Sequence, residues 1–351
     1  MAETGERQVR RKARLVVMGA GLIGKRHIEH VAREAELAAV VDPSPAAREI
    51  AEAHGAPWFP SLAALLDDRC PDGVIIATPN QLHIENGMEC VAAGLPMLIE
   101  KPIADDVASA ETLVARAEEA GVPILVGHHR RHNPLIRRAR EEIQSGRIGT
   151  VIAVHGMCWF CKPDDYFDVQ WRRQPGAGPV FLNLIHDIDL LRYLCGDVVS
   201  VQALESNAIR GNPVEETAGI LLRFRNGAIG TVTVSDAIVA PWSWELTAME
   251  NPAYPRTGQS CYMIGGTHGS LSIPDLGIWR NPGKRSWWEP IERQSVAYGT
   301  DDPLALQIRH FADVALGRAS PLVSGREGLE TLRVIAAVKE AARRGGPVEI
   351  G

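Results

Sequence analysis

The sequence lacks the long apolar and basic segments that mark membrane proteins and nucleic-acid-binding proteins. None of its apolar runs approaches the roughly 18 residues that a membrane-spanning helix requires. Lysine and arginine form no long block, and the formal net charge of the 351 residues is -6. We therefore expect no membrane contact and no nucleic-acid partner. Residues 1–13 are polar and basic with no apolar segment behind them, which predicts a disordered tail of a cytoplasmic protein rather than a secretory signal.

Cysteine is sparse, and its spacing argues against a disulfide framework and against a zinc module. The six cysteines are scattered, and the CxxC from Cys158 to Cys161 has no second pair after it. Positions three apart in a strand face opposite sides of the sheet, which hinders joint metal ligation. Two arginines separate His129 from His132, so we interpret these residues and His128 as the lining of a crevice or a solvated loop. We predict buried thiols in a reducing compartment and no metal site.

Aromatic residues make up 5% of the chain and are nearly absent from its first part. Only Trp58 and Phe59 precede residue 150, so the two parts of the chain differ in composition. A length of 351 residues also favours about two domains. The aromatic residues of the second part are best explained as core or subunit interface, and stacking on a sugar ring is the alternative.

Residues 14–128 alternate between short apolar runs and helical patterns. Strands are expected at residues 14–18, 37–41, 73–77, 96–99 and 123–127, and helices at 22–34, 45–54, 62–66, 80–93 and 105–120. Nearly continuous apolar strands are typical of a parallel sheet that helices cover on both faces. We predict an α/β Rossmann domain with a doubly wound parallel sheet of six strands, five of them at the ranges given, and a ligand crevice at the carboxyl ends of the strands.

The pattern changes at residue 129. Strands are expected at residues 150–160, 198–208, 217–225, 228–235, 244–248, 261–265 and 270–273, and helices at 134–145, 181–194, 304–316 and 326–344. Turn signals separate the strands, which favours antiparallel pairing. We predict that residues 129–351 form an α+β domain for substrate binding and oligomerisation, with a large open, mostly antiparallel sheet. The closing helices at 304–344 either belong to this second domain or pack back on the first domain.

A glycine motif follows the first strand. Gly19, Gly21 and Gly24 form Gly-x-Gly-x-x-Gly at the point where the strand turns into a helix. The amides at the helix start, among them those of Leu22 and Ile23, have no partner within the helix and suit a pyrophosphate. Gly19 allows the tight turn, Gly21 the approach of the phosphates, and Gly24 the packing of helix on strand. The alternative is a glycine turn with a purely structural role.

Asp42 ends the second strand and lies after Gly24 at roughly the 20-residue spacing of a ribose-binding acid. Its charge repels a 2′-phosphate, which favours NAD over NADP. Arg48 partly offsets that repulsion. We predict NAD as the cofactor, with NADP as the less favoured alternative.

Two further strand ends carry polar side chains. Thr78, Asn80 and His83 follow one strand, and Glu100 and Lys101 follow the next, so we expect them on the rim of the crevice near the nicotinamide. A lysine just past a buried strand is partly desolvated and can donate to a substrate oxygen or relay a proton. The alternative is a structural Glu100–Lys101 pair at the surface.

A second polar cluster lies in a helix of the second part. Asn183, His186 and Asp187 share one face by spacings of three and four residues, and Asp189 follows His186 by three. Histidine is the natural acceptor for an alcohol proton near neutral pH. Asp189 either holds the imidazole in one tautomer or pairs locally. A structural histidine is the alternative reading of His186.

With these residues in place, the chain resembles the Gfo/Idh/MocA family of oxidoreductases, named for glucose–fructose oxidoreductase and inositol dehydrogenase, over about residues 14–350. The motifs that carry the resemblance are Glu100-Lys101-Pro102, Ala77-Thr78-Pro79-Asn80 with His83, Trp171-Arg172 with Gly176-Ala177-Gly178, His186-x-x-Asp189 and Val323-Ser324-Gly325-Arg326-Glu327-Gly328-Leu329.

The resemblance implies hydride transfer between NAD or NADP and a sugar, polyol or related cyclic alcohol, in a homodimer or homotetramer. It implies that Lys101 and His186 are catalytic, and we add Asn183 to them. Residues expected to bind the cofactor are Gly19, Gly21, Leu22, Ile23, Gly24, Asp42, Thr78, Asn80, His83, Glu100 and Lys101. Residues expected to bind the substrate are Lys101, Arg131, Trp171, Arg172, Asn183, His186 and Asp187.

The chain departs from the family pattern beside the catalytic histidine. Many members carry an aspartate four residues before it, where Leu182 stands here, and Asn183 lies three before it. An amide hydrogen-bonds a hydroxyl but cannot accept its proton at neutral pH. His186 is therefore expected to act as the base, together with Lys101.

Two other functions follow from the same resemblance. Some relatives cleave a glycosidic bond by hydrolysis or elimination through transient oxidation with retained NAD, and others are dinucleotide-binding regulators without catalysis. The intact Lys101 and His186 count against a regulator. A sugar or cyclitol dehydrogenase is the leading hypothesis.

Overall fold

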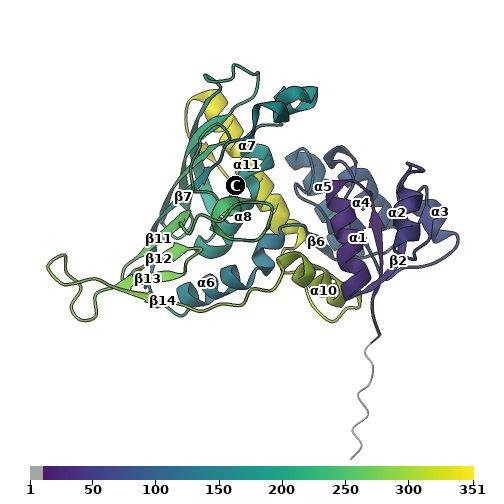
Figure 1. Ribbon diagram of the computed structural model, residues 1–351, viewed down its shortest axis with the longest axis horizontal. Helices are drawn as coiled ribbons and strands as arrows, with labels where there is room; N and C mark the ends of the chain where they lie inside the picture. The colour runs from purple at the N-terminus through teal and green to yellow at the C-terminus, as the bar shows by residue number, and fades with distance from the viewer. Residues whose placement is uncertain (1–10) are drawn as a thin grey trace, which may run out of the picture. The chain divides into compact units, whose positions relative to one another are not determined.

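The computed structural model describes residues 11–351, so most of the expected tail lies outside the described residues. The chain divides into two compact units (Figure 1). The first takes the chain up to Gly127 together with Leu304–Arg326, and the second takes His128–Pro303 and Glu327–Gly351. The division therefore lies next to residue 128 and gives one late helix to the first unit. No helix among residues 11–351 is long and apolar enough to cross a membrane.

The first unit is the predicted Rossmann fold. Its parallel sheet has six strands in the order β3-β2-β1-β4-β5-β6. The strands are β1 (Arg14–Met18), β2 (Glu36–Val41), β3 (Trp58–Phe59), β4 (Gly73–Ile76), β5 (Met97–Ile99) and β6 (Ile124–Val126). The order reverses between β1 and β4, which is where this topology places its ligand crevice.

Local capping residues begin and end helices of the first unit. Ser61 caps α3 by accepting from Ala64 N at 3.2 Å, and Gly121 ends α5 in the left-handed conformation. The helices are α1 (Leu22–Glu34), α2 (Ala47–Ala53), α3 (Leu62–Leu66), the 3-10 turn η1 (Asn80–Leu82), α4 (His83–Ala92), α5 (Val107–Ala120) and α10 (Pro303–Ala315). The predictions for α1 and α3 are confirmed to the residue, whereas residues 80–93 divide into η1 and α4.

A late segment of the chain completes the first unit. Phe311 of α10 is fully buried and would contact a side chain placed at Gly73. Val126 N donates to Val323 O at 2.8 Å, and Leu125 forms an isolated antiparallel bridge with Ser324. The core beneath β4 and β6 is therefore built partly from residues that follow the second unit in sequence.

The second unit holds a nine-stranded sheet in the order β14-β13-β12-β11-β7-β10-β9-β8-β15, and Figure 1 shows α6, α8 and α11 on one side of it. Only β10 and β7 pair in parallel, so the prediction of a mostly antiparallel sheet is confirmed. The strands are β7 (Val151–Trp159), β8 (Val198–Ser206), β9 (Thr217–Phe224), β10 (Ile229–Ser235), β11 (Tyr262–Gly266), β12 (Ser270–Ile273), β13 (Gly277–Arg280), β14 (Glu292–Ser295) and β15 (Val348–Glu349).

The second unit also contains helices and short 3-10 turns. They are η2 (His129–His132), α6 (Pro134–Gln144), η3 (Asp164–Asp168), η4 (Gln170–Arg173), α7 (Pro179–Leu182), α8 (Leu184–Cys195), α9 (Trp244–Thr247) and α11 (Gly325–Arg344). The predicted strand at 244–248 is wrong, because this segment is helix α9. Ser243 caps it by accepting from Leu246 N at 3.4 Å, and the buried Trp244 anchors its first turn.

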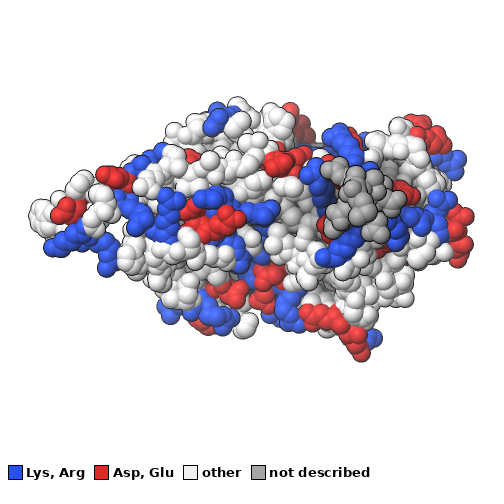
Figure 2. Space-filling model, turned by 90° about the horizontal axis from the view of Figure 1, so that it is seen from below, with Lys and Arg blue, Asp and Glu red and all other residues white. Residues whose placement is uncertain are grey.

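Charge is mixed over the surface. On the face that Figure 2 shows, Lys and Arg side chains lie next to Asp and Glu side chains rather than in one basic field. Four of the six cysteines are buried, but Cys70 and Cys161 are exposed, so the prediction of buried thiols is wrong for these two. Among residues 11–351, no group of three or more His, Cys, Asp or Glu side chains has the arrangement of a metal site.

Candidate active site

Two of the motif glycines are required by the packing of the first unit itself. Gly19 has φ +94°, and a Cβ there would lie 2.6 Å from the carbonyl oxygen of Ala77. A Cβ at Gly24 would lie 2.0 Å from the carbonyl oxygen of Gly19. Side chains at these positions would collide with backbone, so the turn between β1 and α1 can close only with glycine.

Gly21 is different, because no atom lies within 4 Å of the place its Cβ would occupy. It is the N-cap of α1, and no side chain caps the amides of that helix start. The side chain of Leu22 is exposed beside it. Open space next to uncapped amides at the positive end of a helix is suited to a phosphate group.

Asp42 is held at the carboxyl end of β2. One carboxylate oxygen accepts from Ala20 N and the other from Ser44 N, each at 2.8 Å. Trp58 Nε1 donates to the Asp42 carbonyl at 3.0 Å, and the Arg48 guanidinium lies 4.9 Å from the centre of the Trp58 ring. The carboxylate is thus fixed next to the glycine turn, and each oxygen retains a lone pair for a further donor.

His83 joins two of the strand ends. It is buried at the start of α4, with Nδ1 2.8 Å from Pro102 O and Nε2 3.0 Å from Thr78 O. Thr78 Oγ1 donates to Asn86 Oδ1 at 2.9 Å, and Asn80 is half-buried in η1. His83 therefore positions the segments around Thr78 and Lys101 from inside the unit.

Glu100 also lies in the interior. Its Oε1 accepts from His27 Nε2 at 2.7 Å, and its Oε2 accepts from Lys101 N at 3.2 Å. His27 is fully buried in α1. The pair links α1 to the end of β5 and orients the backbone at the half-buried Lys101. The sequence interpretation missed His27, although a histidine on the buried face of an amphipathic helix is a signal for an internal partner.

In the second unit, His186 lies in the first turn of α8. Pro179 starts the short helix α7, and Asn183 interrupts the helical path with φ -110° before α8 begins. Asn183 Oδ1 is buried and has no hydrogen-bond partner, so it can accept from a bound hydroxyl group. His186 is 9% exposed. The predicted helical face thus combines a buried imidazole with an amide that can accept one more donor.

Two further imidazole rings contact His186. The ring centre of His128 lies 6.0 Å away and that of His129 5.4 Å away, both edge to face. His128 and His132 are buried, so the interpretation of a solvated loop is wrong for these two residues. The histidine-rich segment after β6 surrounds the candidate base.

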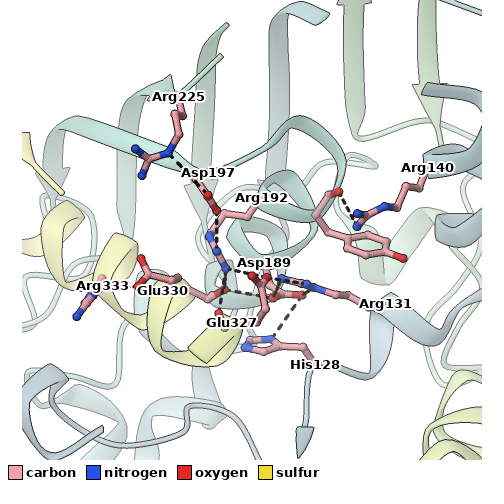
Figure 3. A network of polar contacts seen from close by, with 12 residues as sticks. His128, Arg131, Arg140, Asp189, Arg192, Asp197, Arg225, Glu327, Glu330 and Arg333 are labelled. Atoms are coloured by element: carbon pink, nitrogen blue, oxygen red, sulfur yellow. Dashed lines mark hydrogen bonds and ion pairs between the residues drawn. The ribbon is translucent and has the colours of Figure 1, made fainter. Parts of the chain in front are cut away.

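Asp189 pairs with arginine (Figure 3). Arg131 Nε and Nη2 donate to its two oxygens at 2.8 and 2.7 Å, and Thr331 Oγ1 donates at 3.2 Å. Arg131 also donates to Glu327 at 2.9 Å. Burial would raise the pKa of Asp189, but Arg131 and His128 keep it below its ordinary value. The network ties η2, α8 and α11 together. Arg131, which was expected to bind substrate, uses its guanidinium for these internal contacts.

Asp187 faces the sheet. It is 1% exposed, accepts from Tyr262 Oη, and lies 3.6 Å from Arg130 Nη1. Burial raises its pKa to about 6 against the opposing effect of Arg130. Arg130 in turn donates to Glu245 at 2.7 Å. Asp187 therefore joins α8 to β11 and α9 within the core, although it was expected to contact a substrate.

Trp171 and Arg172 lie in η4 at the surface of the second unit. Trp171 is 54% exposed. Arg172 Nη1 donates to Tyr166 O at 2.9 Å, and its guanidinium lies 4.1 Å from the centre of the Tyr166 ring. These contacts fold η3 onto η4 and leave the Trp171 indole available for stacking.

Two domain models match this chain. Residues 13–128 match the oxidoreductase family NAD-binding Rossmann fold, and residues 136–272 match the GFO/IDH/MocA C-terminal domain. The chain belongs to the Gfo/Idh/MocA family of oxidoreductases. The resemblance stated from the motifs is confirmed, and the chain is a nicotinamide-dependent dehydrogenase by family.

Several relatives of known name are similar over much of the chain. The rhizopine catabolism protein MocA of Rhizobium meliloti is 28% identical, covering 63% of this chain and 70% of its own. The scyllo-inositol 2-dehydrogenase (NAD(+)) of Bacillus subtilis is 26% identical, covering 97% and 96%. The WlbA dehydrogenase of Bordetella pertussis, solved with NADH and UDP-GlcNAcA, is 27% identical with a TM-score of 0.77, covering 97% and 99%.

The glycine turn yields a matched pair of variants. Gly21→Ala places a methyl group in open space, so we expect wild-type thermal stability with NADH affinity reduced at least about tenfold, or about 1.4 kcal/mol. Gly24→Ala drives a methyl group into backbone, so we expect loss of stability by several kcal/mol. Thermal unfolding and fluorescence titration with NADH measure the two effects. Equal affinity of Gly21→Ala and wild type would contradict the phosphate site.

The carboxylate of Glu250 gives a pH-dependent prediction. Burial would raise its pKa, but His129 and Arg130 lower it from 4.5 to about 2. A lowered pKa means that ionised Glu250 stabilises the fold above pH 4.5, and that this contribution is lost as the pH falls toward 2. We expect Glu250→Gln to lower the urea midpoint at neutral pH, with a gap to wild type that narrows in acid. Glu292→Gln, at an exposed position of β14, is the control. If the difference in urea midpoint between Glu250→Gln and wild type stays constant with pH, ionisation of Glu250 is not its cause.

Proposed function

We propose that the protein is an NAD-dependent dehydrogenase that oxidises a hydroxyl group of a sugar, cyclitol or related polyol. The observation that carries the proposal is the open space at Gly21 between uncapped helix amides and the fixed carboxylate of Asp42. No neighbouring protein atom would clash with a side chain at Gly21, so packing within the protein does not explain the glycine. The close approach of a dinucleotide phosphate does explain it. The family of oxidoreductases to which the chain belongs supports the same reading.

The residues of the first unit fit a dinucleotide. The amides of Leu22 and Ile23 face the pyrophosphate position, and the remaining lone pairs of Asp42 suit ribose hydroxyls. When bound, the nicotinamide supplies the hydride acceptor of the reaction. His83 and Glu100 support the strand ends from within, and Thr78 and Asn80 remain the candidates for direct contact with the cofactor.

Asp42 also favours NAD over NADP. A 2′-phosphate beside this carboxylate would bring like charges together. Arg48, a candidate to neutralise them, lies over the Trp58 ring. The Bacillus relative is named for NAD(+), and the Bordetella structure holds NADH.

His186 serves as the proton acceptor in this proposal, Lys101 stabilises the substrate oxygen, and Asn183 Oδ1 accepts a hydrogen bond from a substrate hydroxyl. A buried imidazole near neutral pH is an efficient general base. Trp171 and Arg172 contribute stacking and hydrogen bonds to the substrate. Arg131 and Asp187 act as supports, because their partners are inside the fold.

The substrate class is supported by the names of the relatives. One acts on scyllo-inositol, and one was solved with a nucleotide sugar. Both carry several adjacent hydroxyl groups, which match the amide, imidazole and ammonium donors and acceptors of this chain. Screening sugars, inositols and their acids for reduction of NAD identifies the substrate.

The proposal also covers the oligomeric state and the cellular location of the protein. The outer face of the nine-stranded sheet exposes Leu221, Ile229, Met263 and Trp279, which is an apolar area typical of a subunit interface. We propose a homodimer or homotetramer on this face. The six thiols, none of them in a disulfide, support a cytoplasmic location.

The two catalytic residues are tested together. We expect Lys101→Met and His186→Asn each to reduce kcat by about 10²-fold or more, while NADH affinity stays close to wild type. The double variant should lose little more than either single variant, because groups that act in one step are not additive. Steady-state kinetics and NADH titration measure both effects. Wild-type turnover in Lys101→Met would reject its role.

Cofactor preference is tested at the end of β2. Asp42→Asn removes the charge and retains an oxygen that can accept from one backbone amide. We expect kcat/KM for NADP to rise relative to that for NAD by at least about tenfold, or about 1.4 kcal/mol. Asp72→Asn, a carboxylate of the first unit outside the crevice, is the control. An unchanged ratio in Asp42→Asn contradicts the proposed discrimination.

A further inference from the structure

His129 and Glu250 form a hydrogen-bonded pair beside His186. His129 Nε2 lies 2.7 Å from Glu250 Oε1, and the His129 ring lies 5.4 Å from the His186 ring, centre to centre. No sequence pattern marks Glu250, because it lies in an irregular segment far from His129 in the chain. The fold brings a second imidazole, backed by a carboxylate, against the candidate base.

The Glu250 carboxylate has a fixed orientation. Its Oε2 accepts from Asn133 Nδ2 at 3.0 Å and from Trp244 Nε1 at 3.2 Å, which leaves Oε1 for His129. The preceding residue, Met249, has φ +57°, a left-handed conformation that a residue other than glycine seldom adopts. Backbone strain of this kind persists where the surroundings fix it, and it recurs at functional sites.

This orientation determines what His129 can do. A carboxylate accepts hydrogen bonds only, so Nε2 carries the proton of the neutral ring and Nδ1 is left as the basic nitrogen. The His129 side chain is 20% exposed, whereas that of His128 is 2% exposed. Of these two neighbours of His186, His129 has the greater access to water.

The other imidazole–carboxylate contact serves a different purpose. His128 Nδ1 lies 4.0 Å from Asp189 Oδ2, and Arg131 already donates to both oxygens of that carboxylate. Asp189 is therefore neutralised by a buried guanidinium, while Oε1 of Glu250 is directed to an imidazole. The second arrangement places a carboxylate oxygen at hydrogen-bond distance from the imidazole, which stabilises an imidazolium that forms for a short time.

We propose that the His129–Glu250 pair relays the proton of the substrate hydroxyl from His186 to solvent. The inference rests on the proposed function. Oxidation of one hydroxyl breaks a C–H and an O–H bond; the hydride leaves with two electrons for the nicotinamide, and the proton leaves for His186. The relay moves that proton to Nδ1 of His129 and then to water, while Glu250 stabilises the transient imidazolium. His129 acts through His186 and does not contact the substrate.

The test compares His129→Asn with wild type. Without the relay, proton release becomes slow, so we expect kcat to fall at least about tenfold with little change in KM. The solvent deuterium isotope effect on kcat should rise, and added imidazole should restore a large part of kcat. Glu250→Gln should show the same changes to a smaller degree. His54→Asn, exposed at the end of α2 in the first unit, is the control and should match wild type.

Two kinetic outcomes overturn the relay. One is an unchanged kcat in His129→Asn; the other is a lower kcat with an unchanged isotope effect and no response to imidazole, which indicates a structural role. Nitrogen-15 NMR of labelled histidine adds a measurement without turnover, because a proton on Nδ1 instead of Nε2 of His129 also overturns it. If wild type oxidises no sugar or polyol, the proposed function itself fails, and the relay fails with it.

Discussion

The buried contact between Arg131 and Asp189 is the interaction on which the second unit's site depends. Removing two charges from water costs several kcal/mol, and only close, fully satisfied partners offset that cost. Here both oxygens of Asp189 and three nitrogens of the guanidinium are engaged. The contact therefore has one permitted geometry. It fixes the histidine-rich η2 segment against the first turns of α8, where His186 lies.

Around this contact, charged side chains serve as supports more often than as ligand contacts. Asp187, Arg130 and Glu245 link α8, η2 and α9, and Glu100 with His27 does the same in the first unit. Each group has at least one oppositely charged or imidazole partner inside its own unit. Such networks hold side chains to a few tenths of an ångström, and general acid–base catalysis needs positioning of that accuracy.

Sequence reasoning predicted the fold well where the pattern is local. The turn from β1 into α1, the helix at 62–66 and the parallel strands depend on neighbouring residues. It failed at 244–248, where alternating apolar residues resemble a strand but a serine cap and a buried tryptophan give a helix. Helical spacing led to the prediction that His186 and Asn183 share a site, and that assignment stays a prediction. Sequence reasoning could not find the partners of Asp187 or His129, because Tyr262 and Glu250 are brought to them by tertiary folding.

The late segment in the first unit has a consequence for biosynthesis. Phe311 fills the core beside Gly73, and Val323 extends the hydrogen bonding at the edge of β6. A growing chain reaches these residues only after the whole nine-stranded sheet except β15 has been translated. The first unit therefore cannot complete its core until nearly the whole chain has been synthesised. A dissected fragment that stops at Gly127 would carry the same unfilled core permanently.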